Sequence, residues 1–217
     1  YISCGDENIA SAFLVPALKQ AKKYQRSVGF FSSGVFGPII DGVVGLSRNG
    51  GSIEIIASPK LNEEDIEAIS LGYQHRTQII ENAFTRDFVS EIESLDDAKL
   101  QLLATLIANG TLDIKIAVTE TDGIYHDKLG ILEDFDGNVI VFYGSANESF
   151  SGYKSNYEKI RVVKSWVASD VASIEDERDE FNALWNGLNP YVQVLGYKES
   201  AKGHILEVVE RRKESKS

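Results

Sequence analysis

Residues 125–158 read YHDKLGILEDFDGNVIVFYGSANESFSGYKSNYE, and the rest of the chain is organised around them. Apolar residues predict a strand at 125–133 and another at 139–144. Between them, residues 136–138 read Asp-Gly-Asn, which is a hairpin turn signal. A polar loop and a further strand at 157–164 follow. The stretch therefore predicts part of a β-sheet with a set of polar side chains beside it.

Five side chains of this stretch carry the candidate chemistry: His126, Lys128, Ser145, Asn147 and Glu158. Side chains two residues apart on a strand point to the same face, so the histidine and the lysine are expected to project together, as are the serine and the asparagine. A lone histidine near a strand end is more often structural than catalytic. The combination, however, suits covalent attack on a phosphodiester without a metal, with the carboxylate holding an imidazole by one ring nitrogen.

The chain before this stretch alternates between helical and strand patterns. Helices are predicted at 7–24 and 34–47, and strands at 26–32 and 52–58. Short connections between alternating helices and strands are typical of an α/β layer with parallel strands. The expected fold class is therefore α/β, with a mixed, mostly parallel sheet flanked by helices.

An α-helical insertion is predicted at about 62–110, followed by a strand at 112–119. The predicted helices of the insertion span 62–71, 73–93 and 96–109. After the central stretch, a helix is expected at 167–187 and a last strand or edge at 191–196. The charged segment 199–217 is either a fraying helix or a linker to a missing domain. The corresponding domain prediction is one domain at 1–190 and a C-terminal edge strand, helix or linker at 191–217.

Composition limits the kinds of partner. The 217 residues carry a net charge of −11, which argues against a generic nucleic-acid binder. A local basic groove remains compatible with it, and the candidate cations are Lys128, Lys154, Lys159, Arg161 and Lys164. One cysteine, no apolar run of about 20 residues and no signal-peptide pattern predict a cytoplasmic protein with no membrane partner. A first residue that is Tyr and the lack of Met indicate an excised domain.

The sequence motif of this stretch resembles that of the phospholipase D superfamily, whose pattern is H-x-K-x4-D followed by G-S/G-x-N. The residues that carry the resemblance are His126, Lys128, Glu133 or Asp134, Gly144, Ser145, Asn147 and Glu158. The chain most resembles the PLD-like nuclease domains linked to DEAD/DEAH-type helicases in restriction and defence proteins, as does its opening segment LVPALKQAKKYQRSVGFFSSGVF (14–36). The fold implied is a PLD-like half-domain. Glu133 replaces the usual aspartate, and a structural role is expected for that acid.

The resemblance implies a mechanism without a metal or another cofactor. His126 attacks phosphorus and forms a phosphohistidine, while Lys128 and Asn147, assisted by Ser145, stabilise the charge on the phosphoryl oxygens. A second histidine protonates the leaving oxygen and later activates water, and Glu158 orients a histidine. Two smaller expectations concern the substrate: Lys154 contacts a phosphate and Tyr153 stacks on a base.

The second histidine is not supplied by a second motif in this chain. The remaining histidines are His75 and His204, and neither is followed by a lysine two residues later. We therefore expect a C2 homodimer that brings two His126–Lys128 pairs together. The alternative is a second motif in another part of the parent protein.

Three functions are compatible with these residues. The first is cleavage of DNA by the nuclease module of a restriction protein, with a fused helicase domain as a further partner. The second keeps the chemistry but acts on a phospholipid headgroup ester. The third is a degenerate, non-catalytic PLD-like domain used for binding or dimerisation. The intact motif favours the first two, while the net charge and Glu133 favour the third.

Overall fold

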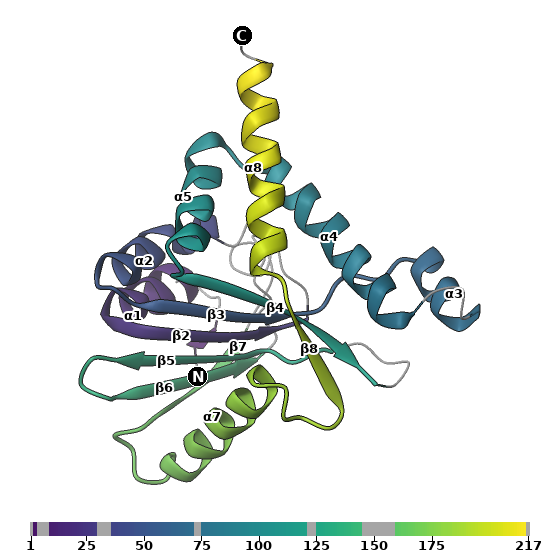
Figure 1. Cartoon of the computed structure of the whole chain (residues 1–217). Helices are drawn as coiled ribbons and strands as arrows, with labels where there is room; N and C mark the ends of the chain where they lie inside the picture. The colour runs from purple at the N-terminus through teal and green to yellow at the C-terminus, as the bar shows by residue number, and fades with distance from the viewer. Residues whose placement is uncertain are drawn as a thin grey trace.

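The structure is a computed structural model, and it describes residues 2–3, 9–29, 36–71, 75–120, 125–144 and 159–215. A central sheet has helices on both of its faces (Figure 1). The strands are β1 (Ile2–Ser3), β2 (Ala21–Val28), β3 (Ser52–Ala57), β4 (Leu112–Thr119), β5 (Leu129–Asp134), β6 (Val139–Gly144), β7 (Lys159–Lys164) and β8 (Val192–Gly196).

The strand order of this eight-stranded sheet is β1-β7-β6-β5-β2-β3-β4-β8. The α/β class with a mixed sheet is confirmed. The expectation that most strands would be parallel is wrong for the described sheet, because only β2–β3 and β3–β4 pair in parallel. The other five neighbouring pairs are antiparallel. One physical reason is local: a four-residue turn joins β5 to β6, and so short a connection reverses the chain.

The helices are η1 (Ala10–Leu14, a π-helical turn), α1 (Val15–Gln20), α2 (Phe36–Arg48), α3 (Glu63–Leu71), α4 (Arg76–Ser94), α5 (Asp97–Ala108), α7 (Val171–Trp185) and α8 (Lys198–Glu214). The predicted helical insertion is present as α3, α4 and α5 between β3 and β4. Within the described residues, no helix is both long and apolar enough to span a bilayer.

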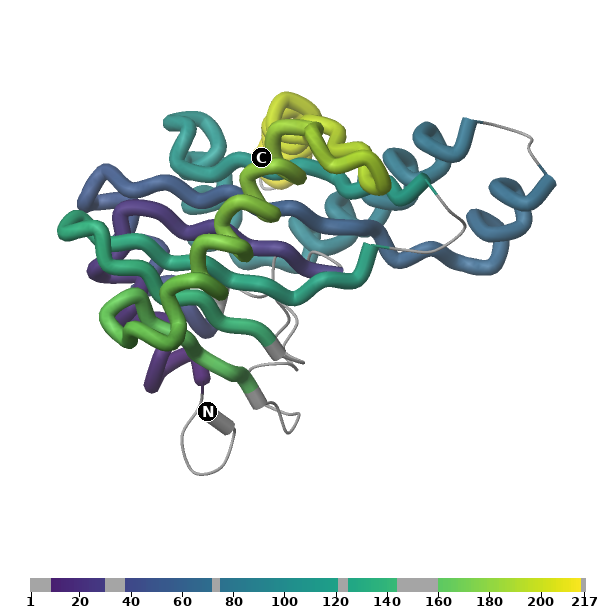
Figure 2. Tube along the Cα trace, turned by 90° about the horizontal axis from the view of Figure 1, so that it is seen from below, coloured from purple at the N-terminus to yellow at the C-terminus, as the bar shows by residue number. Residues whose placement is uncertain are grey.

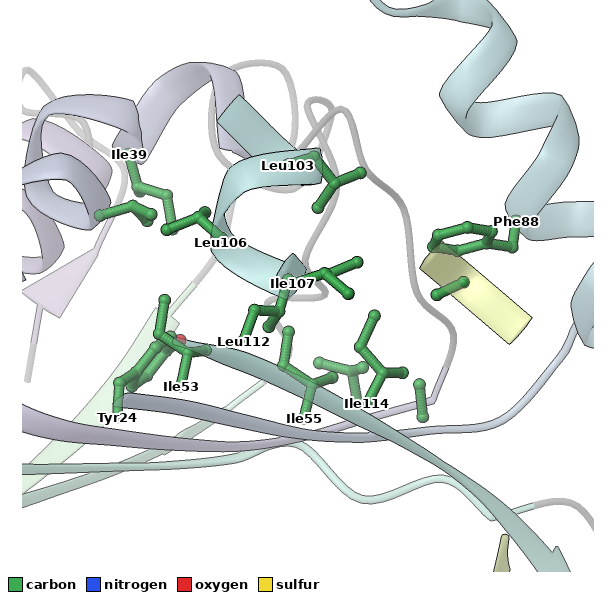
Figure 3. Packing of buried hydrophobic residues seen from close by; sticks show 14 of the residues in the cluster. Tyr24, Ile39, Ile53, Ile55, Phe88, Leu103, Leu106, Ile107, Leu112 and Ile114 are labelled. Carbon is green, nitrogen blue, oxygen red and sulfur yellow. The ribbon is translucent and has the colours of Figure 1, made fainter. Parts of the chain in front are cut away.

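Alternating strand residues supply two hydrophobic clusters, one on each face of the sheet. Ile53 and Ile55 of β3 pack into the larger cluster, under α2, α5, α4 and α8, as Figure 3 shows. Ile56 of the same strand joins the smaller cluster instead. There it meets α7, which crosses that face of the sheet (Figure 2) and contributes Ile174 and Phe181.

Three predicted boundaries are wrong, one at a helix end and two at strand starts. The helix predicted at 7–24 ends at Gln20, and β2 starts at Ala21 rather than at residue 26. Hydrogen-bonded pairing with β3 on one side and β5 on the other extends the strand backwards, which apolar spacing alone does not reveal. The strand predicted from residue 125 begins only at Leu129.

The C-terminal segment is a helix packed on the domain in its described part. Ala201, Ile205 and Val208 of α8 are buried in the larger cluster. Arg212 adds hydrogen bonds to Asp97 and to the carbonyl of Leu95. Just before it, β8 forms an edge strand paired antiparallel with β4. In its described part the region contains an edge strand followed by a helix.

Candidate active site

The candidate site lies at the edge of the sheet where parallel strands β2, β3 and β4 end. Ligands of open α/β sheets bind at the carboxyl ends of such strands. The segment 125–128 arrives at this edge as irregular backbone and continues into β5. Pairing between β2 and β5 stops at Arg26 and Gly130, so the residues before Gly130 leave the ladder beside the end of β2.

His126 is exposed and its ring lies against Gly29, the residue that follows β2. A β-carbon built on Gly29 would be 2.7 Å from Cδ2 of His126 and 3.4 Å from its Nε2. The imidazole therefore occupies space that exists only because this residue has no side chain. Sequence reasoning missed Gly29. Its signal was a glycine directly after a buried strand, a position where another group often approaches the backbone.

Asp127 fixes the backbone between the two motif residues. Its Oδ1 accepts a hydrogen bond of 2.7 Å from the backbone N–H of Lys128. Its Oδ2 accepts one of 3.3 Å from the phenol of Tyr125. Burial, together with the nearby charge of Asp127, raises the pKa of Tyr125 above its usual value, so the phenol stays protonated and keeps donating. Neither role was predicted.

The strand-based argument for His126 and Lys128 is wrong, because both precede β5 instead of lying on it. The fold does, however, place the end of β6 beside the start of β5. Leu129, the first residue of β5, pairs with Tyr143 near the end of β6. Gly144, the first letter of the G-S-x-N motif, is the last residue of β6. The two motif segments therefore leave the sheet from adjacent strand ends.

Five predicted site residues lie outside the described residues: Ser145, Asn147, Tyr153, Lys154 and Glu158. Their expected roles stay predictions. On the re-entering strand, Arg161 of β7 pairs in register with Tyr143, and its guanidinium lies 5.8 Å from the ring centroid of that tyrosine. A cation and an aromatic ring therefore flank the end of β6.

The acids after the predicted motif strand have structural contacts. Glu133 forms ion pairs of 2.8 Å with Lys22 of β2 and 3.0 Å with Arg178 of α7. Asp134 accepts hydrogen bonds from the backbone N–H groups of Asp136 and Asn138 across the hairpin turn. Burial raises the pKa of Asp134, but a hydrogen bond from the side-chain amide of Asn138, together with the backbone N–H groups of the turn, outweighs burial and lowers the pKa. The structural role expected for the acid at this place agrees with these contacts.

A small acidic pocket adjoins the motif segment on the α7 side. Its volume is about 150 Å³, and its walls include Ser27, Tyr125, Asp127, Glu177 and Glu180. Burial, followed by the charges of Asp127 and Glu180, raises the pKa of Glu177. The part of the site under α7 is therefore lined by carboxylates, while Arg161 lies over the ring of Tyr143, which packs against the smaller hydrophobic cluster.

The other histidines belong to different elements. His75 directly precedes α4, where its carbonyl accepts the first helical hydrogen bonds. His204 lies on α8, stacked on Tyr197 with ring centroids 6.3 Å apart. In the segments that the structure describes, no group of three His, Cys, Asp or Glu side chains is arranged to hold a metal ion.

A family profile described as "Cardiolipin synthase, PLD-like domain" matches residues 14–185. No curated protein matches the chain. Among solved structures, phosphatidylserine synthase from Haemophilus influenzae Rd KW20 superposes with a TM-score of 0.51 and 16% identity, covering 92% of this chain and 42% of that one. That likeness supports the fold.

Two further solved structures are similar over nearly their whole length. The phospholipase D family member Nuc from Salmonella typhimurium gives a TM-score of 0.48 at 16% identity, covering 90% of this chain and 94% of that one. NucT from Helicobacter pylori gives 0.47 at 14% identity, covering 86% and 90%. The profile match spans most of the sequence and includes His126, Lys128 and the end of β6. This chain therefore belongs to the PLD-like family whose profile is named for cardiolipin synthase.

Proposed function

We propose that this chain is a metal-independent phosphodiesterase that cleaves DNA through a phosphohistidine at His126. The observation that carries the proposal is the register of β5 and β6, which pairs Leu129 with Tyr143. This pairing brings the ends of the H-x-K and G-S-x-N segments to the same point of the sheet edge. A nucleophile and the groups that stabilise phosphoryl charge have to meet at such a point.

The proposed reaction has two steps. In the first, a ring nitrogen of His126 forms a bond to phosphorus while the bond to the leaving oxygen breaks, and a second histidine gives that oxygen a proton. In the second, the same histidine takes a proton from water, the water oxygen bonds to phosphorus and the bond to His126 breaks. Lys128 and Asn147 offset the negative charge on the phosphoryl oxygens in both steps.

DNA is the substrate we favour, because cations flank the strand ends of the proposed site. Lys128 precedes β5, and Arg161 lies on β7 beside the end of β6. We expect the phosphate backbone to lie beside these two cations. The resemblance to helicase-linked domains further suggests a nuclease module of a restriction or defence protein. In such a protein, another domain would supply most of the binding affinity for DNA.

The assembly we propose is a homodimer with two-fold symmetry. The reaction needs two histidines, and the chain has one H-x-K segment. A second copy would supply the other His126 across the axis. Sedimentation at micromolar concentration should show two chains, and a fully active monomer would contradict this assembly.

The direct test is cleavage of plasmid DNA in excess EDTA. We expect the wild type to cut and His126→Ala to lose activity by several orders of magnitude, while the matched variant His204→Ala keeps it. His204 is a suitable control because it lies on α8, beyond the larger cluster. Activity that disappears in the chelator would refute the mechanism, and equal activity of the two variants would refute the assignment of His126.

A second substrate class has one observation in its favour. The family profile carries the name of cardiolipin synthase, which points to phospholipid esters. The chemistry at His126 would be the same, and the headgroup alcohol would leave in place of a nucleotide. Release of headgroup from mixed phospholipid vesicles, without cleavage of plasmid DNA, would replace DNA with this substrate.

A further inference from the structure

The pocket under α7 is built from four parts of the chain that meet beside the motif segment. Ser27 comes from β2, Tyr125 and Asp127 from the segment before β5, Glu177 and Glu180 from α7, and Val192 from the start of β8. Its volume of about 150 Å³ is enough for a group of a few non-hydrogen atoms. Because Tyr125 and Asp127 line it, the pocket adjoins the segment that carries His126 and Lys128.

Negative charge in the pocket is not offset by described cations. Asp127, Glu177 and Glu180 have no ion pair with a lysine or arginine in the part of the chain that the structure describes. Arg178, the neighbour of Glu177 on α7, is engaged by Glu133 instead. The raised pKa of Glu177, caused by burial and by the adjacent carboxylates, reflects this unbalanced charge.

A second observation is independent of these acids. The Ser27 side chain is 1% exposed, lines the pocket, and its hydroxyl has no hydrogen bond in the described structure. It lies close enough to the phenol of Tyr125 to lower the pKa of that phenol, but it makes no hydrogen bond within ordinary distance and angle limits. A buried hydroxyl without a partner costs about 1–3 kcal/mol. A ligand that reaches the pocket wall would satisfy it.

The carboxylates and the Ser27 hydroxyl together favour a ligand that carries positive charge and several N–H donors. A protonated primary amine has three donors on one small charged nitrogen, which suits a pocket lined by carboxylates and a hydroxyl. A divalent cation fits less well, since no group of three ligands with suitable placement exists among the described residues. A phosphate would be repelled.

We propose that the pocket lined by Ser27, Asp127, Glu177 and Glu180 is a subsite for a protonated primary amine. The amine comes either from the alcohol part of a phosphodiester substrate or from a small free molecule. The first source rests on the proposed phosphodiesterase function acting on a headgroup ester, since DNA carries no protonated primary amine, while the second source does not.

Binding is measured first, independently of activity, with ethanolamine as the probe. Chemical-shift titration of the wild type should give a dissociation constant on the order of millimolar, as expected for a partly exposed ammonium site. The double variant Glu177→Gln/Glu180→Gln should bind about fivefold or more weakly. Glu175→Gln is the matched control, because Glu175 is exposed on the same helix but does not line the pocket. Ethylene glycol, which lacks the charge, should not bind.

Hydrolysis then distinguishes the two sources. The substrates are 2-aminoethyl 4-nitrophenyl phosphate and ethyl 4-nitrophenyl phosphate, which differ only in the amine. A lower KM for the aminoethyl ester in the wild type, lost in the double variant, assigns the amine to the substrate. Equal KM values with inhibition by ethanolamine that the double variant removes assign it to a free molecule.

These experiments distinguish a failure of the amine subsite from a failure of the phosphodiesterase function. No ethanolamine binding, or binding that Glu175→Gln weakens as much as the double variant does, overturns the subsite even if both esters are hydrolysed. Binding of Mg²⁺ in place of ethanolamine overturns it as well. Specific ethanolamine binding without hydrolysis of either ester supports the subsite and counts against the phosphodiesterase function. Circular dichroism melting confirms that each variant is folded.

Discussion

Gly29→Ala is the substitution that tests the geometry of the proposed nucleophile most directly. The added β-carbon would lie 2.7 Å from Cδ2 of His126, whereas carbon atoms in contact sit at about 3.5–4.0 Å. The ring would have to move by about 1 Å. Gly29 does not have a positive φ, so alanine itself fits the backbone, and the exposed imidazole has room to turn aside.

The consequence is a large effect on catalysis with a small effect on stability. A displacement of about 1 Å in a reacting group costs on the order of 10²-fold in rate. We therefore expect kcat to fall about 100-fold, while the free energy of unfolding changes by less than about 1 kcal/mol. Hydrolysis of ethyl 4-nitrophenyl phosphate and urea unfolding measure the two quantities.

Gly196→Ala is the matched control, since this glycine is the last residue of β8 and an added β-carbon there would meet no atom within 4 Å. It should keep wild-type activity. If Gly29→Ala remained fully active while folded, the placement of the His126 ring against β2, or its role as nucleophile, would be refuted. A loss of activity caused by unfolding would show as a lower melting temperature and would contradict the expected separation of the two effects.

Three further predictions concern stability. Glu133→Gln should lose ion pairs to β2 and α7 and lower the free energy of unfolding by about 1 kcal/mol in urea melts, with activity per folded molecule unchanged; a large loss of activity would show a catalytic role. Gly130→Ala would drive a β-carbon into the ring of Phe142 and should destabilise by about 1–3 kcal/mol in the same assay; a wild-type midpoint would contradict this packing. Glu177→Gln should raise the free energy of unfolding at pH 7. Because the pKa of Glu177 is raised in the folded state, the stability of the wild type falls as pH rises from below 4.5 through the folded pKa. Urea melts at pH 4 and pH 7 should therefore show that the variant is more stable than the wild type at pH 7 but not at pH 4.

Local signals in the sequence determined much of this protein. The hairpin turn ends where predicted because Gly137 supplies a positive φ and Asp134 closes the turn with hydrogen bonds between near neighbours. The helices between β3 and β4 follow from apolar spacing within each segment. The H-x-K and G-S-x-N motifs predict phosphoryl chemistry because that prediction depends on the types of side chain and not on their distant neighbours. For these features, the deciding interactions lie within a few residues of one another.

Tertiary structure decided the features that depend on distant segments. Ala21 belongs to a strand because it pairs with Asp134 of β5, although its spacing also suits the preceding helix. His126 owes its position to Gly29, nearly a hundred residues earlier, and the acidic pocket exists only where α7 meets the segment before β5. Sequence pattern reports which face a residue prefers, but which two segments share an edge depends on long-range pairing and packing. The residue types at 125–158 therefore predict the chemistry, while the end of β2 and α7 determine the surroundings of His126.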